Sequence, residues 1–330
     1  MTETKTNNTA DGQAELTPAE LAKKSSYRDS LKSNDTEEHI DLAFYRPIGY
    51  MWACLAARLG VTPNVITIAS IFLGIGAGVA FYFNNLWINV LGMVLLVWAN
   101  SFDSADGQLA RMTHQYSRIG RILDGMAGDV WFFTIYVAIC LRENVTSQFF
   151  EAHPWVIWTV AIITGICHAK QAAMADYYRQ FHLYFLKGED GSELEQSGHL
   201  KAKLAELSWS RNFWQKLVLF FYTNYTVNQE QWTPRMQALR TALAKRWPGQ
   251  TPPVQFRQAF RAASLPLMKY TNILSFNWRC IALFVSLFAK MPWLYFAFEL
   301  VVLNFLLIYM VCRHEKICRN FTNAIENDKF

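Results

Sequence analysis

Long apolar runs are the feature of this sequence that most restricts its fold. Residues 65–83 and residues 291–312 are almost wholly apolar, and each run is about as long as a helix needs to cross roughly 30 Å of hydrocarbon. The chain is also 52% hydrophobic and only 17% charged, a balance typical of membrane proteins. We therefore predict an all-α integral membrane protein.

The apolar pattern predicts about six transmembrane helices. They are expected at residues 65–83, 86–100, 120–141, 155–173, 271–289 and 291–312. Thr62, Pro63 and Asn64 form a suitable start for the first helix, because Thr can cap a helix and Pro fits its first turn. Gly74 and Gly78 form a GxxxG pattern within it, which predicts a face for close helix packing.

The remaining segments predict structure at the membrane surface. Residues 39–60 mix apolar side chains with Arg46 and Arg58, as in a juxtamembrane amphipathic helix. The polar N-terminus is predicted to be a disordered tail with one short helix, begun by a Thr17 to Glu20 capping box. The predicted division of the chain is 1–36 tail, 37–180 juxtamembrane helix and spans one to four, 181–269 helical insertion, and 270–330 spans five and six.

Two segments of the insertion have a pattern that predicts structure. Met236, Leu239 and Leu243 recur at helical spacing, so we expect an amphipathic helix on the membrane surface or against the protein. Residues 213–225 are apolar and aromatic but too short to span comfortably, and we expect them in the membrane interface.

Basic residues predict the orientation. Arg111, Arg118 and Arg121 flank the second and third spans, and many more lie in the insertion, whereas the opposite side carries only Arg142 and Lys290. Positive loops stay in the cytoplasm, so the acidic motif described next should face it, in a bacterial cytoplasmic membrane or the endoplasmic reticulum. The net charge of +5 fits anionic head groups and loop orientation rather than nucleic acid.

A cluster of acidic residues stands at the end of the second span. Asp103 and Asp106 share one helical face, and Gly107 and Arg111 follow on the same helix. The third span supplies Asp124. Charges near a bilayer core are expensive and usually functional, and three carboxylates from two helices can hold a hard divalent cation that binds a phosphate or pyrophosphate.

This motif resembles the signature of the CDP-alcohol phosphotransferase family. The matching residues are Asp103, Asp106, Gly107, Ala110, Arg111, Gly120 and Asp124. The resemblance implies transfer of a substituted phosphate from a CDP-linked donor to an alcohol, with release of CMP and with Mg²⁺ or Mn²⁺. It also implies a homodimer.

The resemblance assigns roles to these residues. Asp103, Asp106 and Asp124 would be metal ligands, while Gly107, Ala110 and Arg111 would line the pocket for the nucleotide and pyrophosphate. Asn64 and Thr67 open the first span and are further candidates for contact with the nucleotide.

The sequence departs from the family pattern at one position. The family has a second aspartate four residues after the third, but Gly occupies position 128 here and the acid is Asp129. On a regular helix Asp129 would point about 100° away from the expected direction. Either Gly125 and Gly128 permit a bulge or kink that returns Asp129 to the site, or the base is lost. We favour the first and expect Asp129 to be a metal ligand and, with Asp124, a catalytic residue.

Three basic residues within or near spans are candidates for binding an anionic acceptor. They are Arg279, Lys170 and His168. Snorkelling or helix pairing is the competing interpretation for each.

The function predicted from the sequence is phosphatidyl transfer from CDP-diacylglycerol to a small polar alcohol or polyol phosphate. The reverse arrangement, donation of a CDP-linked ethanolamine, choline or inositol head group to diacylglycerol or ceramide, remains open because the motif reads the shared CDP group. An intramembrane prenyltransferase and a non-catalytic transporter are alternatives of other classes.

Overall fold

The computed structural model describes residues 17, 20, 21, 27–30, 33, 35–187, 196–328 and 330. Within these residues the protein is helical and has no strand. Six helical stretches are long and apolar enough to cross a membrane: Pro63–Tyr82, Leu86–Thr113, Leu123–Thr146, Pro154–Leu186, Val254–Phe288 and Leu294–Glu326. The predicted fold class is therefore confirmed.

The α-helices from α2 onward run in the following order within the described chain. They are α2 (Arg46–Leu59), α3 (Pro63–Tyr82), α4 (Leu86–Thr113), α5 (Arg118–Thr146), α6 (Gln148–Ala152), α7 (Pro154–Lys187), α8 (Ser197–Glu206), α9 (Phe213–Gln231), α10 (Pro234–Arg246), α11 (Val254–Ser264), α12 (Met268–Ile273), α13 (Phe276–Phe288), α14 (Leu294–Ala297) and α15 (Asn304–Glu326). A π-helical turn, η5 (Phe298–Leu303), joins α14 to α15.

The helix boundaries follow local chemistry. Gly60 ends α2 in the left-handed conformation, with φ of 68°, which costs glycine little. The Asn85 side chain accepts hydrogen bonds from the Trp87 and Ile88 amides and so caps α4. Ser117 caps α5 in the same way by accepting from the Gly120 amide. These caps place the turn between α4 and α5, and hence the acidic motif, at one end of the membrane-spanning helices.

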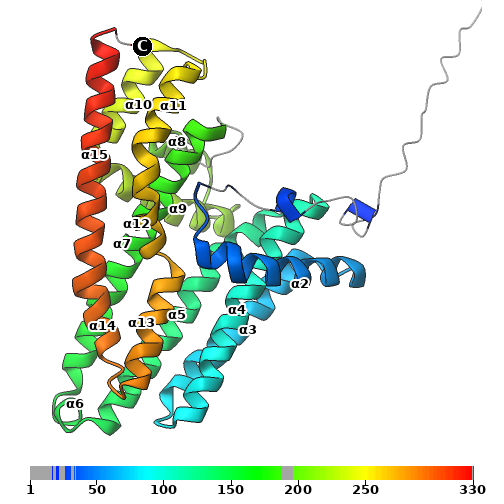
Figure 1. The fold of residues 1–330 in the computed structure, drawn as a ribbon, viewed down its shortest axis with the longest axis vertical. Helices are drawn as coiled ribbons and strands as arrows, with labels where there is room; N and C mark the ends of the chain where they lie inside the picture. The colour runs from blue at the N-terminus through cyan, green and yellow to red at the C-terminus, as the bar shows by residue number, and fades with distance from the viewer. Residues whose placement is uncertain are drawn as a thin grey trace, which may run out of the picture.

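The juxtamembrane helix predicted at residues 39–60 is present. It consists of a π-helical turn, η2 (Asp41–Tyr45), and α2. In Figure 1, α2 lies across the ends of α3 and α4, almost at right angles to the long axis of the molecule. Its buried alanines pack with Ile66 and Leu109 in a small core.

The spans extend farther from the membrane than the sequence pattern indicated. The fourth was predicted to end at residue 173, but α7 continues to Lys187. Tyr178 and Phe181, on this extension, pack in a second core with residues of α10, α11 and α15. The predicted boundary at residue 180 therefore falls inside one helix, and Figure 1 shows this second body standing beyond the level of α2.

The two helical predictions for short segments have clear outcomes. Thr17 and Glu20 form the predicted capping box, since the Glu20 carboxylate accepts from the Thr17 amide at 2.8 Å and the Thr17 hydroxyl accepts from the Glu20 amide at 3.4 Å. Met236, Leu239 and Leu243 are buried on α10, which packs against α15. Of the two alternatives for this amphipathic stripe, packing against the protein is the one observed.

The end of the predicted tail differs from the expectation of disorder. Tyr27–Ser30 form a 3₁₀ helix, η1, and Ser30 and Thr36 are buried. Arg261 donates two hydrogen bonds to Asp35, at 2.5 and 2.8 Å, and these bonds lower the pKa of the Asp35 carboxyl. Ser30 and Asp35 are polar residues that bind polar and charged groups of the helical body, a role that composition alone cannot distinguish from solvation.

The GxxxG face of α3 is a close contact with α5 and yields a stability prediction. A Cβ at Gly74 would lie 2.0 Å from Trp131 Cδ1, whereas a Cβ at Gly76 would lie 3.6 Å from Leu95 Cδ1, an ordinary contact. Overpacking costs about 1–3 kcal/mol. We expect Gly74→Ala to lower the thermal unfolding temperature in detergent, and Gly76→Ala on the same helix to leave it nearly unchanged. Equal unfolding temperatures for the two variants would contradict this packing.

Candidate active site

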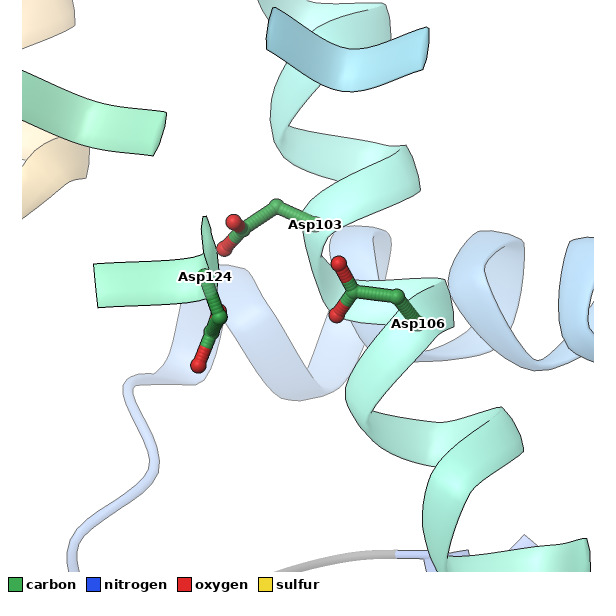
Figure 2. Close-up of side chains that lie close together, drawn as sticks. All are labelled: Asp103, Asp106 and Asp124. Atoms are coloured by element: carbon green, nitrogen blue, oxygen red, sulfur yellow. The ribbon is translucent and has the colours of Figure 1, made fainter. Parts of the chain in front are cut away.

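Two helices bring the motif aspartates together. Asp103 and Asp106 project from α4, and Asp124 projects from α5 (Figure 2). One carboxylate oxygen of each residue lies within 4.8 Å of one from each of the other two. Asp106 is buried, Asp103 is half-buried and Asp124 is exposed. Like charges this close repel one another unless a cation or a proton compensates them, and an all-oxygen donor set suits hard cations such as Mg²⁺ or Mn²⁺.

Residues of helix α3 form hydrogen bonds with the motif and with the start of α5. The Thr67 hydroxyl donates to Asp106 Oδ2 at 2.5 Å, and the Ser117 hydroxyl donates to Asn64 Oδ1 at 3.0 Å. The same Ser117 oxygen accepts from the Gly120 amide at 2.8 Å. Asn64 and Thr67 were predicted to touch the nucleotide; the contacts observed instead fix α4 and the start of α5 relative to α3.

The motif arginine is held by the N-terminal segment. Arg111 Nε donates to the Ser30 carbonyl at 2.7 Å, and Gln108 Nε2 donates to the Ser30 hydroxyl at 3.2 Å. A Cβ at Gly107 would lie 3.4 Å from Arg111 Nη1, so this glycine gives the guanidinium room. Gly107, Ala110 and Arg111 are not among the residues that line the cavity described next. Their expected contact with a nucleotide stays a prediction.

A cavity of about 270 Å³ opens beside the aspartates. Charged and titratable side chains gather in its wall from four helices: Asp103, Asp124, Asp129, His168, Asp176, Arg179 and Arg279. Helices α4 and α5 contribute only carboxylates, α7 contributes His168, Arg179 and the carboxylate of Asp176, and α13 contributes Arg279. This arrangement can accept a phosphate-bearing molecule with its charge directed toward the arginines.

Asp129 reaches the cavity without the expected bulge. Residues 118–146 form one uninterrupted α-helix, and Gly125 and Gly128 both line the cavity with open space where a Cβ would be. The bulge is therefore absent, whereas the alternative of a kink stays a prediction. Because the two glycines leave this face bare, Asp129 can face the cavity from a regular helix, although the three-carboxylate cluster does not include it.

Arg279 belongs to a buried network rather than to an open anion site. Its Nη1 donates to Glu299 and to His168 Nδ1, each at 2.8 Å. Its Nη2 donates to Gln171 at 2.8 Å and to the Leu274 carbonyl at 3.2 Å, and its Nε donates to the same carbonyl at 3.3 Å. All five guanidinium protons are thus engaged, so the prediction of Arg279 as an acceptor ligand is not supported by its contacts.

Glu299 is the centre of this network. It lies in the π-helical turn η5 and is fully buried. Tyr136 donates to it at 2.7 Å, and Tyr295 donates to it as well. A buried carboxylate needs hydrogen-bond partners of this kind. The π-helical turn η5 places the Glu299 side chain among them.

The other two acceptor candidates differ from each other. His168 lines the cavity, with Nδ1 held by Arg279. Lys170 lies over the Trp232 ring, 4.4 Å from its centroid, and does not line the cavity. The cation that the sequence reasoning missed is Arg179, which lines the cavity and donates to Asn272 at 3.4 Å. Arg179 lies beyond the predicted end of the fourth span at residue 173, in a segment whose helical continuation the sequence pattern did not predict.

Comparison with known proteins identifies the motif region. The model of the CDP-alcohol phosphatidyltransferase family matches residues 60–181, a range that contains the whole motif and ends within α7. The family resemblance carried by the motif is confirmed for this range.

Curated relatives are similar to a part of this chain. A CDP-diacylglycerol–glycerol-3-phosphate 3-phosphatidyltransferase of Cereibacter sphaeroides is 29% identical over 102 residues, 31% of this chain and 43% of the relative. The protein of that name from Rickettsia felis is 31% identical over 83 residues, 25% of this chain and 46% of the relative. An archaetidylinositol phosphate synthase of Pyrococcus horikoshii is 37% identical over 68 residues, 21% of this chain and 35% of the relative. The matched segments therefore span less than half of each relative.

The Arg279–Glu299 ion pair generates a prediction on stability. Removing one member of a buried pair costs about 3–5 kcal/mol, because the other charge stays buried. We expect Arg279→Met and Glu299→Met each to lower the thermal unfolding temperature strongly, and the double variant to lower it less than the sum of the two. Scanning fluorimetry of all four proteins in one detergent measures the coupling, and strictly additive shifts would contradict it.

Proposed function

Because residues 60–181 carry the domain of the CDP-alcohol phosphatidyltransferase family, we propose that the protein transfers a phosphatidyl group from CDP-diacylglycerol to a small polar alcohol or polyol phosphate. CMP is the other product. The observation that carries this proposal is the cavity in which an aspartate cluster stands opposite an arginine. The curated relatives, named for phosphatidyl transfer to glycerol 3-phosphate and for archaetidylinositol phosphate synthesis, support an acceptor that carries phosphate.

The aspartate cluster is the proposed site for the diphosphate of the donor. Asp103, Asp106 and Asp124 would hold Mg²⁺ or Mn²⁺, which when bound would neutralise the diphosphate and make CMP a better leaving group. Thr67 keeps Asp106 aimed at the cluster through its 2.5 Å hydrogen bond. Asp106 is buried and Asp124 is exposed, so the donor would approach from the Asp124 side.

Asp129 is the proposed general base. It lies on the cavity wall, one turn farther along α5 than Asp124, where it can take the proton from the attacking hydroxyl. The hydroxyl oxygen forms a bond to the phosphorus of the phosphatidyl group, and the bond from that phosphorus to the CMP oxygen breaks. The proton ends on the Asp129 carboxylate.

His168 is proposed to orient the acceptor. A guanidinium only donates hydrogen bonds, so His168 Nδ1, which contacts Arg279 Nη1 at 2.8 Å, is an acceptor. A neutral His168 then carries its proton on Nε2. Glu299, Tyr136 and Gln171 hold this arrangement in place, and His168 can donate a hydrogen bond to an acceptor oxygen in the cavity.

Arg179 is the proposed ligand for the phosphate of the acceptor. It is half-buried on α7 and lines the cavity. Its Nε has no hydrogen-bond partner within the described part of the chain. An arginine fork matches a phosphate with two parallel hydrogen bonds, which gives selectivity for a phosphorylated alcohol over the free alcohol.

The motif is proposed to face the cytoplasm. Arg111 near the end of α4 and Arg118 and Arg121 in the first turn of α5 flank the short connection between these helices, and basic residues beside short connections are the ones that determine orientation. The aspartates and the soluble acceptor would then meet on the cytoplasmic side.

The proposed activity is tested with purified protein in lipid nanodiscs. Labelled CDP-diacylglycerol, Mn²⁺ and a panel of phosphorylated and free polyols should release CMP with a phosphorylated acceptor. Release of CMP from CDP-ethanolamine or CDP-choline with diacylglycerol, but not from CDP-diacylglycerol, would overturn the direction of transfer.

The role of Asp129 gives a prediction that separates catalysis from metal binding. Asp129→Asn should reduce kcat about 10²–10⁴-fold and leave Mn²⁺ affinity close to that of the unmodified protein, because Asp129 lies outside the carboxylate cluster. Asp106→Asn, the matched control, should weaken Mn²⁺ binding at least about tenfold. Electron paramagnetic resonance of free Mn²⁺ measures the affinity. Near-normal turnover by Asp129→Asn would contradict the assignment of Asp129 as the general base.

The role of Arg179 gives a prediction on substrate affinity. Arg179→Gln should raise the KM for a phosphorylated acceptor about 10–100-fold, because a hydrogen bond to a charged group contributes about 1.5–3 kcal/mol. The KM for CDP-diacylglycerol should change little. Lys170→Gln, a charge loss on the same helix but outside the cavity, should leave both values unchanged. An unaltered acceptor KM in Arg179→Gln would contradict the assignment.

A further inference from the structure

Helix α9 exposes large aromatic side chains, beside the exposed Gln215, Asn224 and Asn228, and buries mainly polar ones. The residues that it buries are Leu219, Thr223, Thr226 and Gln229. Its exposed side carries Phe213, Trp214, Phe220 and Phe221, with exposed fractions of 48%, 74%, 41% and 64%. A helix on the surface of a soluble body shows the opposite distribution. The exposed edge of α9 is therefore adapted to an apolar surrounding.

The buried polar face fixes the rotation of α9. Gln229 Nε2 donates to the Ala173 carbonyl of α7 at 2.8 Å. Thr223 and Thr226 satisfy their hydroxyls on carbonyls of α9 itself, at 2.6 and 3.0 Å. Turning the aromatic edge inward would break the bond to α7, so the exposure of this edge is a property of the fold.

Charge along α9 is as sparse as in a membrane-contacting segment. Lys216 is the one charged residue between Phe213 and Gln229, and it points back, donating to the Leu207 carbonyl at 2.6 Å. Lys201, Lys203 and Arg211, just before α9, are exposed. Aromatic side chains beside exposed cations are the composition found at the boundary between lipid head groups and acyl chains.

The position of α9 indicates what covers it. In Figure 1, α9 lies just beyond the level of α2, between the membrane-spanning helices and the body formed by α10, α11 and the far end of α15. It is not one of the six stretches long and apolar enough to span. Helix α9 thus lies at the end of the spanning helices where the motif lies.

We infer that α9 is an interfacial membrane helix whose aromatic edge, formed by Phe213, Trp214, Phe220 and Phe221, inserts into the leaflet next to the motif. The occupant of this surface is the lipid bilayer itself. On the opposite face of α9, Gln229 donates a hydrogen bond to the carbonyl of Ala173 in α7. Ala173 is three residues before Asp176, which lines the cavity. The insertion therefore connects the membrane surface to the wall of the cavity. This inference depends on the membrane fold and is independent of the proposed reaction.

Tyr225 marks the link between α9 and the cavity. Its ring is 38% exposed, yet burial, followed by the nearby Asp176 carboxylate, raises its pKa. Tyr225 follows the aromatic edge along α9 and lies near Asp176 of α7, which lines the cavity.

Depth measurement with nitroxide labels tests the inference. The full-length protein, with its native cysteines replaced, is reconstituted in vesicles and labelled at Phe221→Cys, at Asn228→Cys on the same face two turns later, or at Gln250→Cys beyond α10. We expect the label at 221 to be accessible to oxygen and shielded from a water-soluble nickel chelate, the label at 228 to be shallower, and the label at 250 to be exposed to nickel. Equal nickel accessibility at 221 and 250 would overturn the inference. Spin–spin broadening at 221 would also overturn it, since a second copy of the chain would then cover the edge.

A second measurement avoids replacing the cysteines. The difference in fluorescence between the unmodified protein and Trp214→Phe reports on Trp214 alone. Lipids brominated on their acyl chains should quench this difference signal by about half or more. The corresponding signal of Trp247→Phe, from the half-buried tryptophan at the end of α10, should not be quenched. Equal quenching of both, or of neither, would contradict membrane insertion of α9.

Discussion

The convergence of three carboxylates is the constraint on which the rest of this structure depends. Asp103, Asp106 and Asp124 lie within 4.8 Å of one another at the end of membrane-spanning helices, where charge is expensive. The backbones that carry them must therefore be held firmly. Thr67 fixes Asp106 from α3, and the bare Gly74 lets α3 approach the Trp131 ring of α5. Packing inside the membrane thus determines the geometry of the polar site.

A buried ion pair lies next to the cavity, in the wall formed by α13. Arg279 and Glu299 form a buried pair at 2.8 Å, and the same guanidinium orients His168. Because every guanidinium proton is engaged, Arg279 positions other groups instead of binding an anion. Arg179 also lines the cavity, where its Nη2 donates to Asn272 at 3.4 Å.

The insertion adds surfaces that the matched family region lacks. The family match ends at residue 181, and α10 and α11 beyond it build a second core with α7 and α15. Helix α9 turns polar side chains toward α7 and aromatic ones outward. The same chain segment therefore stiffens the extension of α7, which carries Asp176 and Arg179, and presents an apolar edge to the bilayer.

The sequence by itself determined the six spans, the juxtamembrane helix and the spacing of Asp103, Asp106 and Asp124, because hydrophobic length and helical periodicity are local properties. Only the tertiary structure decided the surroundings of Asp129, Arg179 and Arg279. Asp129 reaches the cavity because two glycines leave its helix face open, not through a bulge. Arg279 is engaged by His168, 111 residues away in the chain. Such contacts depend on how distant helices pack, and no local pattern records them.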